Sequence, residues 1–140
     1  MIGMLFLSNI NGQSLEEYQW ENRILIIETP NKSNERYQSQ MNEFVNLEVD
    51  LLDRKMLIIE IVADQYKTTN YLLEQNDTEW KELESSSKKS TIETFKVTLI
   101  GLDGSIKLEQ KDILTKEELF RIIDSMPMRK SELRNKTKRQ

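Results

Sequence analysis

Two apolar stretches, Ile24-Leu25-Ile26-Ile27 and Met56-Leu57-Ile58-Ile59-Glu60-Ile61-Val62, decide how the rest of the chain is interpreted. Both are short and rich in β-branched residues, which is typical of strands buried on both faces of a sheet. Between them, residues 34–52 place apolar side chains at helical spacing, and Ser33 or Asn34 is a candidate N-cap. This order predicts a βαβ unit with parallel strands and a right-handed crossover. The apolar side chains of the predicted helix are Tyr37, Met41, Phe44, Val45, Leu51 and Leu52.

The second half of the chain has the pattern of a β-hairpin followed by a helix. Apolar and polar residues alternate through residues 95–109, on either side of the turn sequence Gly101-Leu102-Asp103-Gly104. Thr115 and Glu118 then form a capping box that begins a helix, and we expect Pro127 to end it. The apolar face of this helix consists of Leu119, Ile122, Ile123 and Met126.

A βαβ half followed by a ββα half predicts an α/β fold of the thioredoxin-like type. We expect a mixed central sheet with helices on both faces, although another α/β sandwich with the same order of elements is not distinguished. Residues 64–94 follow neither period. A length of 140 residues suits one domain. We divide the chain into an N-terminal arm or signal-peptide remnant (1–17), the thioredoxin-like domain (18–128) and a basic C-terminal tail (129–140).

The residue types that are missing exclude much chemistry. The chain contains no Cys and no His, so it cannot carry thiol oxidoreductase or peroxidase activity, a disulfide or a His-ligated metal. No cofactor or metal is expected. The leading hypothesis is a non-catalytic domain that binds a partner, which we expect to be a protein of unknown identity. The alternative is an enzyme of unknown type that works without thiols.

Charge is unevenly distributed along the chain, whose net charge is −4. Residues 129–140 hold six basic side chains and one acidic one, which leaves 14 basic and 23 acidic side chains in residues 1–128. The body is therefore −9 and the tail +5. An acidic body repels phosphate backbones, so we do not expect nucleic acid as the partner. The tail is either a solvated terminus or a site that binds anions or an anionic surface.

The N-terminal stretch Met1–Ile10 is apolar and uncharged, and small polar residues follow it. This resembles the end of a secretory signal, although an apolar arm lying on the body would have the same composition. We therefore expect a periplasmic or extracellular protein. No apolar run reaches the length of a membrane span.

Several strings are similar to one protein family. They are Tyr18–Arg23, Asp53-Arg54, Leu99–Lys107 and Ile123–Arg129, together with Tyr37 and Gln40. The chain resembles, from about Tyr18 to Glu132, the peroxiredoxin-like domain of unknown function called the DUDES domain. That family occurs in bacterial proteins and in vertebrate secreted matrix proteins with sushi repeats. The resemblance implies a thioredoxin-like fold and an exported setting, but no mechanism. The sequence departs from the family at Gln19 and Leu102.

In thioredoxin-like proteins the chemistry lies after the first strand, where a helix N-terminus stabilises a thiolate. The equivalent segment here, Thr29–Asn34, has no Cys. Its backbone N–H groups, hydroxyls and lysine are either a weak anion site or an ordinary capped helix start. The candidate ligand-binding residues are Thr29, Asn31, Lys32, Ser33 and Arg129.

A second candidate motif is structural. We expect Arg23 to be at least half buried, with a carboxylate within hydrogen-bond reach, Asp124 being the first choice, and Trp20 packed over the strand end. The other reading is that Arg23 faces a ligand. Three further aromatic residues, Tyr66, Tyr71 and Trp80, line either a ligand cleft or the core.

If Met1–Ile10 is the end of a signal peptide, mature protein from the native host begins near Gln13 or Ser14. N-terminal sequencing of the natively produced protein checks this. Protein that retains Met1 would contradict the expectation.

Overall fold

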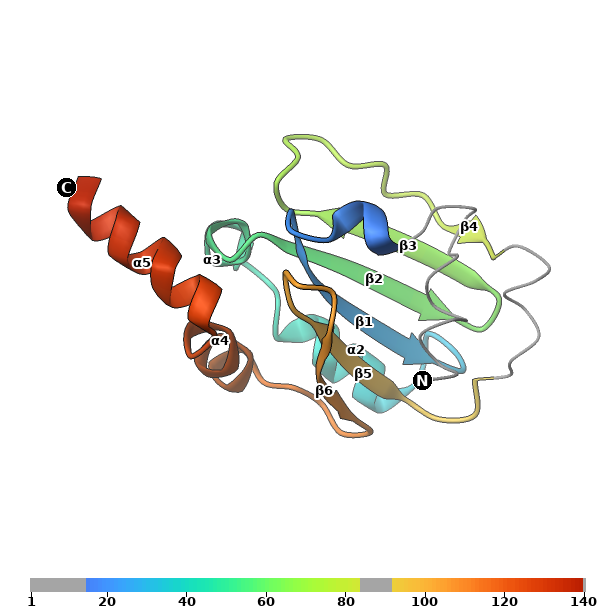
Figure 1. Ribbon diagram of the computed structural model, residues 1–140. Coiled ribbons are helices and arrows are strands. Elements are labelled where there is room, and N and C mark those ends of the chain that lie inside the picture. The colour runs from blue at the N-terminus through green and yellow to red at the C-terminus, as the bar shows by residue number, and fades with distance from the viewer. Residues whose placement is uncertain (1–14, 84–91, 140) are drawn as a thin grey trace.

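The sheet is built around strand β1 (Arg23–Thr29), the first element of the predicted βαβ unit. In the computed structural model, which describes residues 15–83 and 92–139, β1 pairs in parallel with β2 (Met56–Val62) and antiparallel with β5 (Lys96–Ile100). All residues of β1 and β2 are buried, which confirms both predicted strands. The six strands follow the order β4-β3-β2-β1-β5-β6 (Figure 1). The expectation for Met1–Ile10 lies outside the described residues.

The predicted hairpin is present. Strand β6 (Ile106–Gln110) pairs with β5, and Gly104 in the connecting turn has a positive φ of 83°, which glycine adopts without strain. The Asp103 carboxylate accepts hydrogen bonds from the backbone N–H and the hydroxyl of Ser105, and these bonds lower its pKa to about 2. The turn is thus fixed by its own side chains.

Two strands fall in the stretch that gave no prediction. Strand β3 (Gln65–Asn70) pairs antiparallel with β2, and the two-residue β4 (Lys81–Glu82) pairs with β3. Polar residues dominate β3, and only Tyr66 in it is fully buried. The turn before it contains Ala63 at a φ of 54° and no glycine, so the usual hairpin signal is missing.

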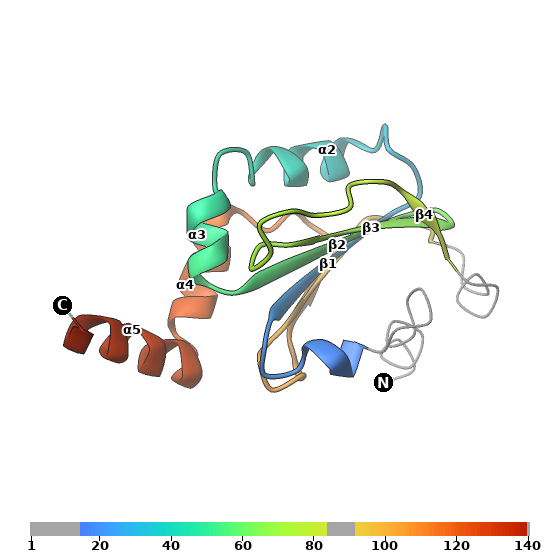
Figure 2. The ribbon, with the colours of Figure 1, turned by 90° about the horizontal axis from the view of Figure 1, so that it is seen from above.

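Helices lie on both faces, but unequally. One face is covered by α2 (Glu35–Asn42), α3 (Glu48–Asp53) and α4 (Lys116–Asp124), and the other by the 3₁₀-helix η2 (Leu15–Tyr18) (Figure 2). The core beneath the three helices is the larger of two. It is formed by Leu25, Ile27, Tyr37, Phe44, Leu51, Met56, Ile58, Val62, Phe95, Val97, Leu99, Leu114, Leu119 and Ile123.

The single helix predicted for residues 34–52 is wrong. Asn34 is the N-cap, as predicted, and its side chain accepts the backbone N–H of Tyr37. The helix stops after Asn42, however, and Asn46 adopts a φ of 63°, which breaks the helical path before α3. Val45 and Leu52 consequently face solvent instead of the core.

Pro127 does more than end a helix. The Thr115 hydroxyl accepts the Glu118 backbone N–H, which confirms the predicted cap of α4. After Asp124 the chain turns, and Pro127 becomes the first residue of α5 (Pro127–Arg139), where its missing N–H is harmless. Most of the basic tail is therefore helical, and α5 projects from the body (Figure 1).

This architecture is compatible with a thioredoxin-like α/β fold. Strands β2-β1-β5-β6 contain the parallel pair and the antiparallel hairpin that the sequence predicted, and β3 and β4 extend the sheet beyond β2. None of the helices in the described residues combines the length and apolar character that a membrane span needs.

Gln40 joins α2 to the segment before α4. Its side chain is fully buried, donates to the Leu114 carbonyl at 2.8 Å and accepts the Leu114 N–H at 2.7 Å. Gln40→Ala leaves the buried N–H and C=O groups of Leu114 without hydrogen-bond partners and should lower the free energy of unfolding by about 2–6 kcal/mol. Urea unfolding checks this. Gln38→Ala, on the exposed side of the same helix, should change stability by under about 1 kcal/mol; equal losses would refute the assignment.

Candidate functional site

The loop after β1 is closed on itself. Thr29 is fully buried and its hydroxyl donates to the Asn31 carbonyl at 2.9 Å. The Ser33 hydroxyl donates to the Asn31 side-chain oxygen at 2.8 Å. Lys32 lies over the Trp80 ring, 4.3 Å from its centroid. These predicted residues do come together, but their hydroxyls are engaged within the loop and no thiol is present.

Two carboxylates of the central strands are buried near this loop. Glu60 accepts the Tyr37 hydroxyl at 2.5 Å and pairs with Lys67 at 3.5 Å. Burial, then the bond to Glu60, raises the pKa of Tyr37, which keeps its hydroxyl a donor. Glu28, on the opposite sheet face, pairs with Lys96 at 3.4 Å, yet burial still raises its pKa. The hydrogen bond between Tyr37 and Glu60 joins α2 to β2, so Glu60 has a structural role.

The start of β1 holds a buried arginine. Arg23 is fully buried, and its two terminal nitrogens lie 3.4 Å and 3.2 Å from the carboxylate oxygens of Glu132 in α5. One of them also donates to the Arg54 carbonyl at 3.0 Å. The predicted burial and ion pair of Arg23 are therefore present. The partner is Glu132 instead of Asp124, because α5 continues past the predicted end of the last helix.

Asp124 serves two other arginines. Arg54 makes two hydrogen bonds to it, at 3.2 Å and 2.9 Å, and Arg129 makes one at 3.0 Å. Arg129 is 3% exposed and also bonds the Asp53 carboxylate at 2.6 Å and Glu132 at 3.2 Å. We call Arg23, Arg54 and Arg129 with these three carboxylates the arginine cluster.

The arginine cluster shifts the pKa values of its aspartates. Burial acts to raise the pKa of Asp53, but hydrogen bonds from Lys136 and Arg129 and their charges outweigh it and lower the pKa. The pKa of Asp124 is lowered in the same way by Arg54 and Arg129. Both groups thus stay ionised at neutral pH, and every charge of the cluster has a counter-charge. This fits a structural network better than an open ligand site.

Arg129 does not join the other predicted ligand-binding residues. It bonds the backbone carbonyl of Asp53, before β2 begins, whereas Thr29 ends β1. A seven-residue strand separates these two ends of the sheet, which corresponds to about 20 Å. Trp20 does not pack over the strand end as predicted. It is 58% exposed, with a positive φ of 71°, and its backbone N–H bonds the Leu102 carbonyl.

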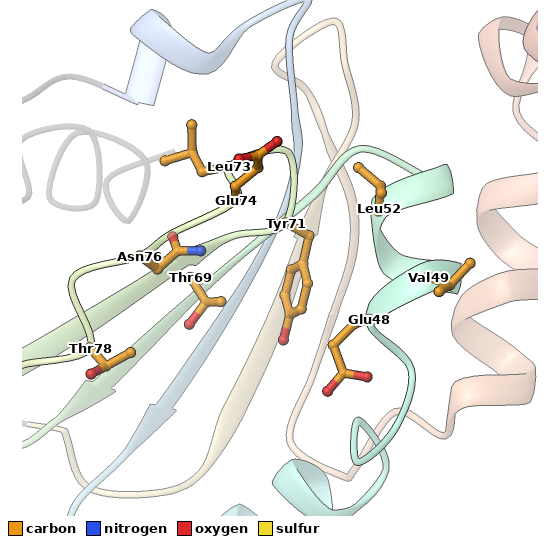
Figure 3. A pocket seen from close by; sticks show the side chains of 9 residues that line it. All are labelled: Glu48, Val49, Leu52, Thr69, Tyr71, Leu73, Glu74, Asn76 and Thr78. Carbon is orange, nitrogen blue, oxygen red and sulfur yellow. The ribbon is translucent and has the colours of Figure 1, made fainter.

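A groove lies between α3 and the segment that follows β3. Its volume is about 430 Å³. In Figure 3 the Tyr71 ring stands between the two walls, with the Glu48 carboxylate toward the hydroxyl end of the ring. The groove is lined by Glu48, Val49, Leu52, Thr69, Tyr71, Leu73, Glu74, Asn76 and Thr78. A volume of this size suits a small ligand or the side chains of a docked segment.

The wall that follows β3 is held by hydrogen bonds of two asparagine side chains. The Asn76 side chain accepts the Asn70 N–H at 2.8 Å and donates to the Asn70 carbonyl at 3.1 Å. The Asn70 side chain accepts the Leu72 N–H and the side-chain amide of Asn22, each at 3.0 Å. Asn22 is buried and lies next to Arg23 in the sequence. The groove is thus preorganised by amide hydrogen bonds.

Exposed apolar side chains surround this groove. Val49 is 78% exposed, Leu73 55% and Leu52 46%, and Leu72 follows Tyr71 on the same segment. Sequence reasoning missed the groove, apart from naming Tyr71 as a residue of a cleft or of the core. Tyr71 belongs to both, because it lines the groove and also packs against the larger core. The one sequence signal was the Leu72-Leu73 pair within a polar stretch.

The two other aromatic residues predicted for a cleft or the core do not line the groove. Trp80 packs on the core, and Tyr66 belongs to the core on the opposite face. Of the acidic residues of α3, Asp53 belongs to the arginine cluster and Glu48 to the groove. The described residues contain no group of three or more acidic side chains placed to hold a metal ion.

Comparison with protein families identifies a match. The family described as Domain of unknown function (DUF4174) matches residues 14–132, most of the chain. The chain belongs to this family. The matched part of the DUF4174 domain includes both Arg23 and Glu132. Comparisons with curated proteins and with solved structures give no match.

Arg23→Ala in this DUF4174 domain should lower the free energy of unfolding by about 2–5 kcal/mol, because it opens a cavity at the start of β1, removes one of the cations paired with Glu132 and leaves the Arg54 carbonyl without its donor. The matched control is Lys130→Ala on the exposed side of α5, for which we expect a change within about 0.5 kcal/mol. Thermal unfolding of the two variants checks this. Equal melting temperatures would show that Arg23 is not a structural anchor.

Proposed function

We propose that this DUF4174 domain is a non-catalytic, thioredoxin-like binding domain that uses the groove between α3 and the segment after β3. The observation that carries the proposal is the exposure of apolar side chains on a groove, one wall of which is held by side-chain hydrogen bonds. Val49, Leu52 and Leu73 are all exposed at its walls, although α3 and the segment after β3 also contribute side chains to the larger core. Contiguous exposed apolar surface marks binding sites in soluble domains.

The loop after β1 supports the non-catalytic part of the proposal. At the place where thioredoxin-like proteins carry a reactive thiol, this chain has Thr29 and Ser33 hydroxyls bonded within the loop. No His exists in the chain to activate either hydroxyl. The groove also lacks a paired acid and base, since its titratable side chains are Glu48, Glu74 and Tyr71. Burial, then the charge of Glu48, raises the pKa of Tyr71 and keeps it neutral.

An exported setting belongs to the same proposal. It is supported by the apolar, uncharged stretch Met1–Ile10 and by the resemblance to the peroxiredoxin-like DUDES domain of secreted and bacterial proteins.

An apolar fluorescent dye tests the groove. Leu52→Glu places a carboxylate on the wall and should weaken dye binding at least about tenfold, because the charge must be desolvated. Val45→Glu is the matched control, since Val45 is exposed but does not line the groove. Equal dye binding by the two variants would contradict the proposal. So would turnover of insulin disulfides or peroxide above a protein-free control.

A further inference from the structure

The outer part of helix α5 makes few polar contacts with the rest of the chain. Of its described side chains beyond Glu132, residues 133–137, only Lys136 makes an ion pair or hydrogen bond to the body, at 2.7 Å from Asp53. A helix of 13 residues is marginally stable in water without packing along one side. The outer part of α5 therefore has a free side that a partner can cover.

The free side of α5 combines cations with one apolar residue. Lys130 and Arg134 are exposed, and Leu133, which is 36% exposed, lies beside them at i, i+3, i+4 spacing, at the border of the face that Arg129 and Lys136 turn toward the body. Neither Lys130 nor Arg134 forms an ion pair within the described residues; Arg134 bonds only the Ser131 hydroxyl. The face is thus a leucine flanked by two unpaired positive charges.

The groove has the complementary character. Glu48 and Glu74 stand on opposite walls, and neither has an ion-pair partner in residues 15–83 and 92–139. Apolar Leu52 and Leu73 line the groove between them. A groove with apolar walls and two acidic side chains is complementary to a leucine that has two basic neighbours. The overall charges agree, because the body is −9 and the tail +5.

The two surfaces cannot meet within one chain. Arg129 and Lys136 hold α5 beside Asp53, the last residue of α3, and α5 leaves the body away from the segment that follows β3, which forms the other wall of the groove (Figures 1 and 2). We infer that the groove of one chain binds α5 of a second copy, with Leu133 between its walls and Lys130 and Arg134 facing Glu48 and Glu74. This inference rests on the proposed function of the groove and names its occupant.

Charge reversal on each surface tests the inference by sedimentation velocity at low salt. Wild-type protein should self-associate with rising concentration and dissociate as salt screens the contact. Glu48→Lys/Glu74→Lys and Lys130→Glu/Arg134→Glu should each weaken self-association at least about tenfold, because like charges then face each other. An equimolar mixture of the two variants should associate again, since each surface then meets an opposite charge.

Matched controls carry the same charge changes elsewhere. Glu21→Lys/Glu117→Lys and Lys111→Glu/Lys116→Glu alter exposed residues outside both surfaces and should associate like wild type. A wild-type protein that stays monomeric at its highest soluble concentration overturns the inference. So does a mixture of the two charge-reversal variants that fails to associate.

Dye binding separates this inference from the proposed function. If Leu52→Glu weakens dye binding but none of the charge-reversal variants changes the sedimenting mass, the groove binds apolar groups but its occupant is not α5. If instead Leu52→Glu leaves dye binding unchanged, the groove is not a binding site, and both the proposed function and the inference about α5 are wrong.

Discussion

The bidentate contact between Arg23 and Glu132 links the first residue of the central strand to a helix 109 residues later. A fully buried guanidinium is costly without a counter-charge, so α5 must return to the sheet for β1 to keep its position. Arg129 shares the same carboxylate at 3.2 Å and fixes the first turns of α5 to Asp53. The direction in which α5 leaves the body follows from these contacts, not from apolar packing.

The same end of β1 also positions both walls of the groove. Asn22 precedes Arg23 and bonds Asn70, which holds the segment after β3 in place. Arg54, which bonds Asp50 and Asp124, lies against the Phe120 ring at 4.0 Å and holds α3 between β2 and α4. Polar contacts at one sheet edge therefore set the width of the groove, while its surface is largely apolar.

The elements that sequence predicted are those set by local rules. Period-two alternation, the Asp103-Gly104 turn and the caps at Asn34 and Thr115 each act within a few residues, and each is present. The failures have non-local or exceptional causes. Strand β3 follows a turn with Ala63 at a positive φ, and Asn46 splits a helix whose apolar period continues across the break.

The candidate site was less accessible to sequence than the fold. Burial of Arg23 could be anticipated from its place beside an apolar strand, but many carboxylates compete to be its partner, and only the path of α5 selects Glu132. The groove depends on the exposure of Val49 and Leu52, which helical periodicity alone does not reveal. Apolar residues at helical spacing predict a face, not whether that face is covered.

The burial of β1 on both faces and both edges has a consequence for synthesis on the ribosome. Its neighbour β2 emerges soon after it, but Leu25 pairs with Leu99 of β5, more than seventy residues later in the chain. At ordinary translation speeds the backbone N–H and C=O groups on one edge of β1 stay unpaired for about 4–15 s. During that interval the nascent chain presents an unprotected strand edge, and a factor that shields such edges would increase the yield of folded protein.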